Sequence, residues 1–310
     1  MSTPIFPAER NAQGGFDRQP DAFRDWVTAD GSSPYPAAAG RYHLYVSLAC
    51  PWAHRIVILR QLKGLEPVVG MTVVDPLRND EDGWKSTDGD PVNGFRFLKE
   101  AYLATDPGFC GRVTVPVLWD KQTGRVVSNS DDDLLRMFNS AFDGCGGDRT
   151  VDFYPEALRA DIDRLNALLY DEVNDGVYRT GFADDQADYE RHVFVLFDAL
   201  DRLDTRLGER RYLHGATVTE SDWRLFVTLV RFDAVYVGHF KCNLCRIADY
   251  PHLSGYLRDL YQVPGVADTV NMDHIKRHYY MTHPEINPTR IVPAGPVQDL
   301  TRPHGRQALG

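Results

Sequence analysis

Residues 42–64, YHLYVSLACPWAHRIVILRQLKG, decide the fold of this chain. The stretch from Tyr42 to Leu48 alternates and is rich in residues that favour strands. Cys50 and a proline follow, and apolar residues at helical spacing then continue to Gly64, a residue type that often ends helices. Pro67 to Val74 predicts a second strand. The order is therefore strand, helix, strand, with a cysteine at the first junction.

The residues that follow complete an α/β unit. Residues 75–112 predict a long polar connection, and loops of that length are often functional or act as lids. Two strands, Val113 to Trp119 and Arg125 to Val127, flank a hairpin turn at Lys121 to Gly124. A helix over Asp131 to Phe142 closes the pattern. This β-α-β, β-β-α order predicts a thioredoxin-like α/β domain.

The second half of the chain has a different period. Apolar residues recur every three or four positions, which predicts helices. The segments with this spacing are Tyr154–Tyr170, Asp185–Leu207, Thr219–Tyr236 and Pro251–Leu260. Thr219 to Asp222 predicts a helix N-cap with an acidic third residue, a purely structural feature. We therefore expect an all-α second domain.

The length and composition of the chain limit the number and kind of domains it can form. The chain has 310 residues, of which 43% are hydrophobic and 25% charged, so it can form two globular domains. We divide it into an extended N-terminal arm with little structure of its own (1–40), the thioredoxin-like domain (41–143), the helical domain (150–280) and a C-terminal extension (281–310). The net charge of −10 argues against a nucleic-acid partner. Without a signal peptide, a long apolar run or a disulfide framework, we expect a cytoplasmic protein.

Cys50 is the candidate nucleophile. A cysteine between a strand and a helix meets unpaired backbone N–H groups and the positive end of the helix dipole, which favour the thiolate. The alternative is a small buried hydrophobic residue, but the Cys-Pro pair after a strand favours the reactive thiol. Ala53 stands where a Cys-x-x-Cys pair would have its second thiol, so an external thiol must clear a mixed disulfide. We expect Arg55, on the same helix, to point to solvent.

Six strings of sequence resemble the xi-class glutathione transferases, also called glutathionyl-hydroquinone reductases. They are CPWAHR (50–55), GRVTVPVLWDK (111–121), NDGVYRTGFA (174–183), RFDAVYVGHFKCN (231–243), YLRDLYQVPGVADTVN (256–271) and HIKRHYY (274–280). The resemblance spans roughly residues 40 to 296. It implies an α/β thioredoxin-like N-terminal domain, an all-α glutathione-transferase C-terminal domain and a homodimer.

The resemblance also implies roles for particular residues. In that family the cysteine attacks the sulfur of a glutathionyl-hydroquinone thioether, hydroquinone leaves, and a second thiol resolves the mixed disulfide. Cys50 would be the nucleophile, Val115 before a proline would pair through its backbone with the thiol, and Trp84 would pack on that thiol. Tyr178 and Tyr279 would line the hydroquinone pocket and donate hydrogen bonds, although a tyrosine on an apolar helix is often only part of a core.

One position departs from the family pattern. Where the family has Asn-Glu-Ser, this chain has Asn129-Ser130-Asp131. Asp131 would set a negative charge beside the carboxylate of a bound γ-glutamyl group, which disfavours glutathione. Carboxylates accept hydrogen bonds from sugar hydroxyls, so the run Asp131 to Asp133 suits mycothiol, a cysteine derivative of glucosaminyl-inositol. The same run could instead only complement a helix dipole. The co-substrate is therefore glutathione or mycothiol.

Other cysteines and histidines predict no site. Cys242 and Cys245 have metal-like spacing, but no second pair of ligands lies near them in sequence, and we expect no metal. His274, His278 and His283 recur near the C-terminus. One of them could protonate a leaving hydroquinone, but packing is the simpler explanation.

Three functions remain open. The first is a thiol-dependent reductase of S-conjugated hydroquinones, with a small-molecule thiol and an aromatic conjugate as partners and no nucleic acid or membrane. A glutaredoxin-like reductase of mixed disulfides would use Cys50 without the tyrosine pocket. A non-catalytic binding module could keep the fold, although the intact cysteine argues against it.

Overall fold

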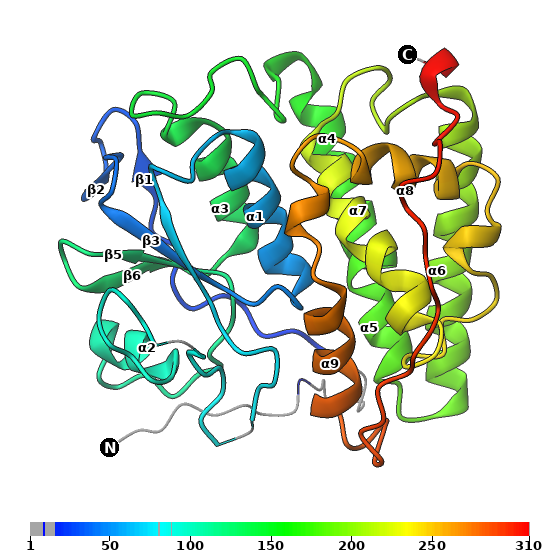
Figure 1. Ribbon diagram of the computed structural model, residues 1–310, viewed down its shortest axis with the longest axis horizontal. Helices are drawn as coiled ribbons and strands as arrows, with labels where there is room; N and C mark the ends of the chain where they lie inside the picture. The colour runs from blue at the N-terminus through cyan, green and yellow to red at the C-terminus, as the bar shows by residue number, and fades with distance from the viewer. Residues whose placement is uncertain (1–8, 10–15, 80, 88, 310) are drawn as a thin grey trace. The chain divides into compact units, whose positions relative to one another are not determined.

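A computed structural model of the protein describes residues 9, 16–79, 81–87 and 89–309. Within these residues the chain forms two compact units (Figure 1). The sheet unit holds the described residues of 19–152 and 269–278, and the helical unit holds those of 9–18, 153–268 and 279–310. The predicted boundaries divide the chain into consecutive segments. In the structure, the described residues of 9–18 belong instead to the helical unit, and residues 269–278 belong to the sheet unit.

Four strands form the sheet of the first unit. They are β3 (Tyr42–Val46), β4 (Gly70–Val73), β5 (Val117–Asp120) and β6 (Arg125–Ser128). Their order is β4-β3-β5-β6, with β3 parallel to β4 and the other two pairs antiparallel. The four predicted strands and the turn at 121–124 are thereby confirmed. Because β3 is buried along its whole length, it lies in the core of this unit.

The helix that follows the cysteine is buried on nearly every side. α1 (Pro51–Leu62) has a proline in its first turn, and all of its residues from Pro51 to Leu59 are buried. A helix without a polar face is stable only inside a core. α3 (Asp131–Arg136) packs against it and continues into a π-turn over Met137–Ala141. The predicted helix from Asp131 is confirmed, and its second half is a π-turn.

The expectation of a long polar loop over residues 75–112 is wrong in one respect. This segment contains α2 (Lys99–Thr105), a helix of seven residues. Its buried residues are Ala101, Tyr102 and Thr105, and the Tyr102 hydroxyl donates to the Thr114 carbonyl oxygen at 3.0 Å. Two turns are too short for a helical period to stand out in the sequence, so only tertiary contacts define this helix.

The arm has more structure than its composition suggests. β1 (Val27–Thr28) and β2 (Tyr35–Pro36) pair in parallel. The Asp25 N–H donates to the Val127 carbonyl oxygen, and the Asn129 N–H donates to the Phe23 carbonyl oxygen, each at 3.0 Å. The expectation of an arm with little structure is therefore wrong from Phe23 onward. Backbone hydrogen bonds to the end of β6 hold it, and these leave no periodic signal.

The helical unit is built from helices of very different length. Its helices are α4 (Arg159–Leu168), α5 (Gly176–Gly181), α6 (Gln186–Glu209), α7 (Glu220–Arg231) and α8 (Leu253–Tyr261), while α9 (Met272–Thr282) begins in the sheet unit and ends in this one. The predicted cap before α7 is confirmed, because Asp222 accepts from the Thr219 N–H at 2.7 Å. Asp222 also accepts from the Tyr256 hydroxyl, so the cap joins α7 to α8.

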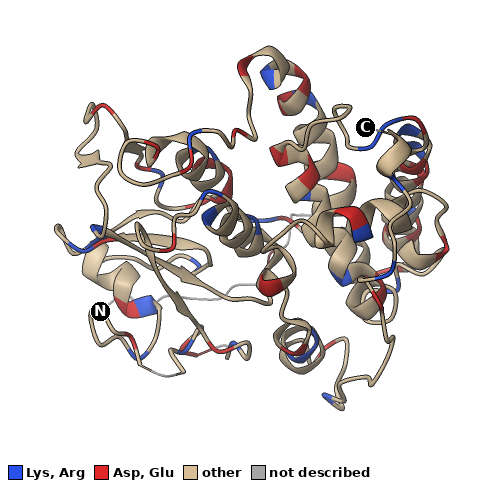
Figure 2. Ribbon diagram, turned by 45° about the horizontal axis from the view of Figure 1, so that its top comes forward, with Lys and Arg blue, Asp and Glu red and all other residues tan. Residues whose placement is uncertain are grey.

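Charges of both signs are interspersed on the same helices (Figure 2). On α6, for example, Arg202 pairs with Asp198 one turn away and with Glu172. Such exposed pairs contribute little to stability. In the described part of the chain, no helix is both long and apolar enough to cross a membrane.

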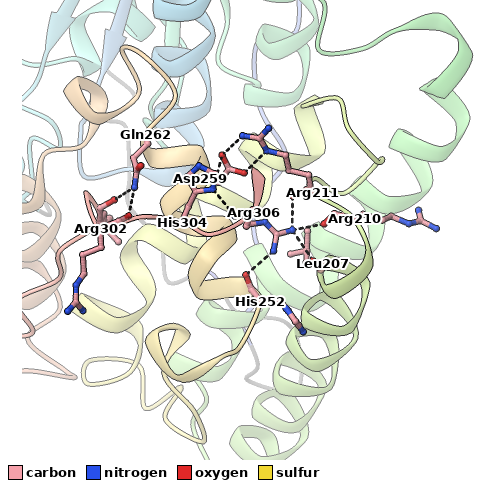
Figure 3. Close-up of polar contacts among 10 residues, drawn as sticks. Leu207, Arg210, Arg211, His252, Asp259, Gln262, Arg302, His304 and Arg306 are labelled. Atoms are coloured by element: carbon pink, nitrogen blue, oxygen red, sulfur yellow. Dashed lines mark hydrogen bonds and ion pairs between the residues drawn. The ribbon is translucent and has the colours of Figure 1, made fainter. Parts of the chain in front are cut away.

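The C-terminal extension is held on the helical unit by one buried arginine. Arg306 is 3% exposed, and its guanidinium donates to the carbonyl oxygens of Leu207 at 2.9 Å and of Arg211 at 2.8 Å (Figure 3). The carbonyl oxygens of Arg210 and His252 are further acceptors. These carbonyls include the last turn of α6, whose oxygens have no partner within the helix. The tail thereby completes the end of α6.

We predict that replacing Arg306 with Met destabilises the protein by about 3 kcal/mol, since several buried carbonyl oxygens lose their donor. Urea unfolding followed by circular dichroism measures this loss. Arg302→Met is the matched control, because Arg302 is exposed and only its carbonyl oxygen takes part in holding the tail. Equal unfolding midpoints for the two variants would contradict the prediction.

Candidate active site

Cys50 is the N-cap residue of α1. Its backbone is extended, with φ −74° and ψ 122°, and its side chain is half-buried. The thiol donates to the Val115 carbonyl oxygen at 3.5 Å, and the Val115–Pro116 peptide bond is cis. The structure thus brings together the cysteine and the residue before the proline, two positions far apart in the sequence. At this place the first N–H groups of α1 favour a thiolate.

The expectation that Arg55 points to solvent is wrong. Its side chain is 1% exposed, and its guanidinium lies over the Trp52 ring at 4.6 Å from the ring centroid. The same group donates to the Asp131 carboxylate at 2.6 Å. Because α1 is buried all round, a charged residue on it must find its partner inside the protein. That partner is the first residue of α3.

The Ser130-Asp131 pair is therefore engaged within the protein. Ser130 is the N-cap of α3 and its hydroxyl accepts from the Asp133 N–H at 3.4 Å. Asp131 is paired with Arg55, and Asp133 is paired with Arg24 in a two-pronged contact at 2.7 Å. The acidic run thus complements a helix N-terminus and two arginines. The negative charge that would oppose a ligand carboxylate is partly neutralised.

An arm residue lies close to the same acidic run. Asp21 is an exposed residue, but the packing of protein around its carboxyl group, and then the negative charge of Asp131, raise the pKa of this group to about 7. A hydrogen bond with Ser130 and the charge of Arg24 act in the opposite direction. Asp21 is a residue that sequence reasoning missed, because nothing in the composition of the arm marks it.

Trp84 lies in the sheet unit, in the connection before α2. Its side chain is 6% exposed and stacks on His278 of α9, with ring centroids 5.3 Å apart and planes 21° apart. The His278 ring donates from Nδ1 to the Pro76 carbonyl oxygen at 2.6 Å, which fixes its tautomer. One face of the indole is therefore covered by His278, one of the three histidines that recur near the C-terminus.

The tyrosines predicted for the site meet in the helical unit. The hydroxyls of Tyr178 on α5 and Tyr279 on α9 are 2.5 Å apart. A third hydroxyl, that of Tyr236, lies 3.1 Å from the Tyr279 hydroxyl. All three side chains are buried. Sequence reasoning missed Tyr236, although it lies within one of the strings that resemble the xi class.

The environment of Tyr279 keeps its phenol protonated. Burial, and then the neighbouring phenols of Tyr178 and Tyr236, raise the pKa of Tyr279 well above its usual value. The positive charge of Arg231 acts in the opposite direction. A phenol in this state can donate a hydrogen bond and can accept one. The cluster is therefore suited to an oxygen-bearing ligand.

The described start of the arm lies against the same tyrosine cluster. The ring of Phe16 stacks on that of Tyr178, with centroids 6.1 Å apart, and the Arg18 guanidinium lies 5.0 Å from the Tyr178 centroid. Arg18 also donates to the carboxylate of Asp175 at 3.0 Å, and Asp175 is 3% exposed. A partly buried ion pair therefore anchors this part of the arm.

Cys242 lies next to Phe240, whose ring packs on the tyrosine cluster. Cys242 is fully buried, and burial raises the pKa of its thiol. Among the residues that the structure describes, no group of three or more His, Cys, Asp or Glu side chains could hold a metal ion.

Family models and curated relatives match this chain over most of its length. The models of the Glutathione S-transferase N-terminal and C-terminal domains match residues 49–140 and 186–259. Glutathionyl-hydroquinone reductase YqjG of Escherichia coli (strain K12) is 52% identical over 310 residues, which cover 96% of this chain and 94% of that protein. Glutathionyl-hydroquinone reductase PcpF of Sphingobium chlorophenolicum is 47% identical, covering 94% of this chain and 93% of that protein.

Solved structures show the same relationship. The glutathione-bound structure of YqjG superimposes with a TM-score of 0.89 at 52% identity, covering 92% of this chain and 96% of that one. The xi-class transferase of Natrialba magadii superimposes with a TM-score of 0.90 at 47% identity, covering 93% and 89%. The chain belongs to the xi class of the glutathione transferases. The predicted fold is confirmed, and this xi-class transferase is an enzyme of thiol transfer or reduction.

The ion pair between Arg55 and Asp131 makes a testable prediction for the xi-class transferase. Asp131→Asn leaves a buried guanidinium without its carboxylate, so we expect a loss of about 2 kcal/mol in unfolding free energy. Asp132→Asn is the matched control, since it removes a charge from the same helix start at an exposed position. Chemical unfolding measures both, and the idea fails when the control loses as much stability as Asp131→Asn.

Proposed function

We propose that this enzyme is a thiol-dependent reductase of S-conjugated hydroquinones. The observation that carries the proposal is the position of Cys50 at the N-terminus of α1, with its sulfur 3.5 Å from the Val115 carbonyl oxygen. Two relatives that cover more than nine-tenths of the chain are named glutathionyl-hydroquinone reductases. The family resemblance adds a homodimer to the proposal.

The reaction needs one protein thiol and one external thiol. The Cys50 thiolate attacks the sulfur of the thioether, and a sulfur–sulfur bond forms as the carbon–sulfur bond breaks. Before this attack, a proton from solvent adds to the ring carbon that carries the sulfur while a phenol oxygen of the ring loses its proton, so that carbon becomes tetrahedral. The electron pair of the broken bond then passes through the ring to this oxygen, the oxygen takes up a proton, and hydroquinone leaves. The sulfur has been oxidised and the ring carbon reduced. A second thiol molecule then attacks the mixed disulfide and restores Cys50. Ala53 at the usual second position makes that external thiol necessary.

The other predicted site residues bind the two halves of the conjugate in this proposal. Val115 pairs through its backbone with the cysteinyl part of the thiol, and Trp84 packs against it. Tyr178 and Tyr279 donate hydrogen bonds to the hydroquinone oxygens, where negative charge develops as the carbon–sulfur bond breaks. Burial supports this role, because it keeps the Tyr279 phenol protonated.

Glutathione is the thiol that the observations support best. A relative with 52% identity has been solved with glutathione bound. The argument for mycothiol depends on the charge of Asp131, and Arg55 already pairs with that carboxylate. Where the family has a glutamate, this chain has Ser130. The ammonium group of a bound γ-glutamyl residue would therefore lack that carboxylate partner. Mycothiol is therefore the alternative for the same site.

We predict that Cys50→Ser lowers the release of hydroquinone from a glutathionyl-hydroquinone by more than about 10³-fold, because the nucleophile is lost. Chromatographic detection of free hydroquinone measures the rate, and mass spectrometry of the unchanged enzyme detects one glutathionyl group on Cys50. Cys110→Ser, at an exposed cysteine, is the control and keeps full activity. Retention of activity in Cys50→Ser would overturn the mechanism.

Calorimetric titration of the Cys50→Ser variant with each thiol separates the two co-substrates. We expect glutathione to bind more tightly than mycothiol, since Arg55 neutralises the charge of Asp131. Tighter binding of mycothiol would instead assign the site at Ser130 and Asp131 to a polyol. An enzyme that reduces mixed disulfides but releases no hydroquinone would point to the glutaredoxin-like function.

A further inference from the structure

The N-terminal arm brings a carboxylate to the start of α3. Asp21 is exposed, and its carboxylate accepts a hydrogen bond from the Ser130 hydroxyl. The same hydroxyl accepts from the Asp133 N–H at 3.4 Å. A serine hydroxyl can donate one hydrogen bond while it accepts another, so both contacts form together. Ser130 therefore links the arm to the start of the helix.

The arm is fixed at this place by residues close to Asp21. The Phe23 N–H donates to the side-chain oxygen of Asn129 at 2.8 Å, and the Asn129 N–H donates to the Phe23 carbonyl oxygen at 3.0 Å. Arg24 then holds Asp133 through two hydrogen bonds of 2.7 Å. The carboxylate of Asp21 is thus kept beside the start of α3 by contacts that it does not itself make.

The charges around Asp21 favour a positively charged ligand. Arg24 faces Asp21, but its guanidinium is already engaged with both oxygens of Asp133. The carboxylates of Asp131 and Asp132 face Asp21 as well, and their negative charges raise its pKa. Because a nearby cation lowers the energy of an ionised carboxylate, an ammonium group bound here would be stabilised.

We propose that Asp21 takes the place of the family's glutamate: its carboxylate binds the ammonium group of the γ-glutamyl residue of glutathione. The proposal rests on the function proposed above, in which glutathione is the thiol. The hydrogen bond to Ser130 brings the Asp21 carboxylate within about 3 Å of the serine oxygen. A glutamate at position 130 would extend its own carboxylate over about the same distance. The charge therefore stays in place although a different residue carries it.

This assignment makes the arm part of the thiol site and gives the site a preference. A hydrogen bond between an ammonium group and a carboxylate is stronger than one between neutral groups. Removing the amino group from the thiol and removing the charge of Asp21 delete the same interaction. Their effects on affinity should therefore not add, as for any two changes to one contact.

The test titrates two thiols into the full-length Cys50→Ser enzyme: glutathione, and des-amino glutathione, in which hydrogen replaces the γ-glutamyl amino group. Asp21→Asn in this enzyme removes the charge and keeps an acceptor for Ser130. We expect it to weaken glutathione binding about five- to tenfold, the effect of one exposed charge-assisted hydrogen bond. We expect binding of des-amino glutathione to change less than twofold. Asp25→Asn is the matched control and leaves both affinities unchanged, because this exposed arm carboxylate lies beside Tyr35.

Three results would overturn the role of Asp21. They are equal weakening of both thiols by Asp21→Asn, equal glutathione affinity with and without this substitution, and no binding of glutathione while Asp21 is intact. Release of hydroquinone by the enzyme with Cys50 intact is measured separately. If glutathione affinity depends on Asp21 but no hydroquinone is released, the binding role stands and the proposed reaction fails. If hydroquinone is released and the affinity does not depend on Asp21, only the role of Asp21 fails.

Discussion

The burial of α1 is the constraint on which the rest of the sheet unit depends. A helix buried on nearly every side must lie in the core, and its N-cap residue, Cys50, is held half-buried at the start of this core helix. The same burial leaves Arg55 no route to water, and the guanidinium is paired instead with Asp131 at the start of α3. One ion pair thus joins the helix that carries the nucleophile to the helix start proposed to bind the thiol.

The helical unit places its polar groups by the same rule. Hydroxyls and carboxylates within an apolar core need partners, and Tyr178, Tyr236 and Tyr279 find theirs in one another. Asp222 likewise collects the cap of α7 and a hydroxyl from α8. Each buried polar cluster therefore fixes the relative position of several helices of this unit, and the tyrosine cluster also offers donors to an oxygen-bearing ligand.

Sequence patterns predicted the strands, most helices and the cysteine, because each has a local cause. Alternation marks β3, and the Cys-Pro pair marks the start of α1. The short helix α2 and the strand-like arm had no such mark, since contacts distant in sequence define them. Among the site residues, Tyr178 and Tyr279 came from the family resemblance alone. Tyr236 lay within the same resemblance but could not be selected before its distance to Tyr279 was known.

The sequence by itself determined that a single thiol stands at a helix start, because the residues on either side and Ala53 three positions later are local facts. It also determined two kinds of folding unit, since the period of apolar residues changes along the chain. Tertiary structure alone decided which charges cancel and which hydroxyls meet. Partners such as Arg55 and Asp131 are 76 residues apart, and their pairing follows from the packing of α1 against α3, which no local pattern encodes.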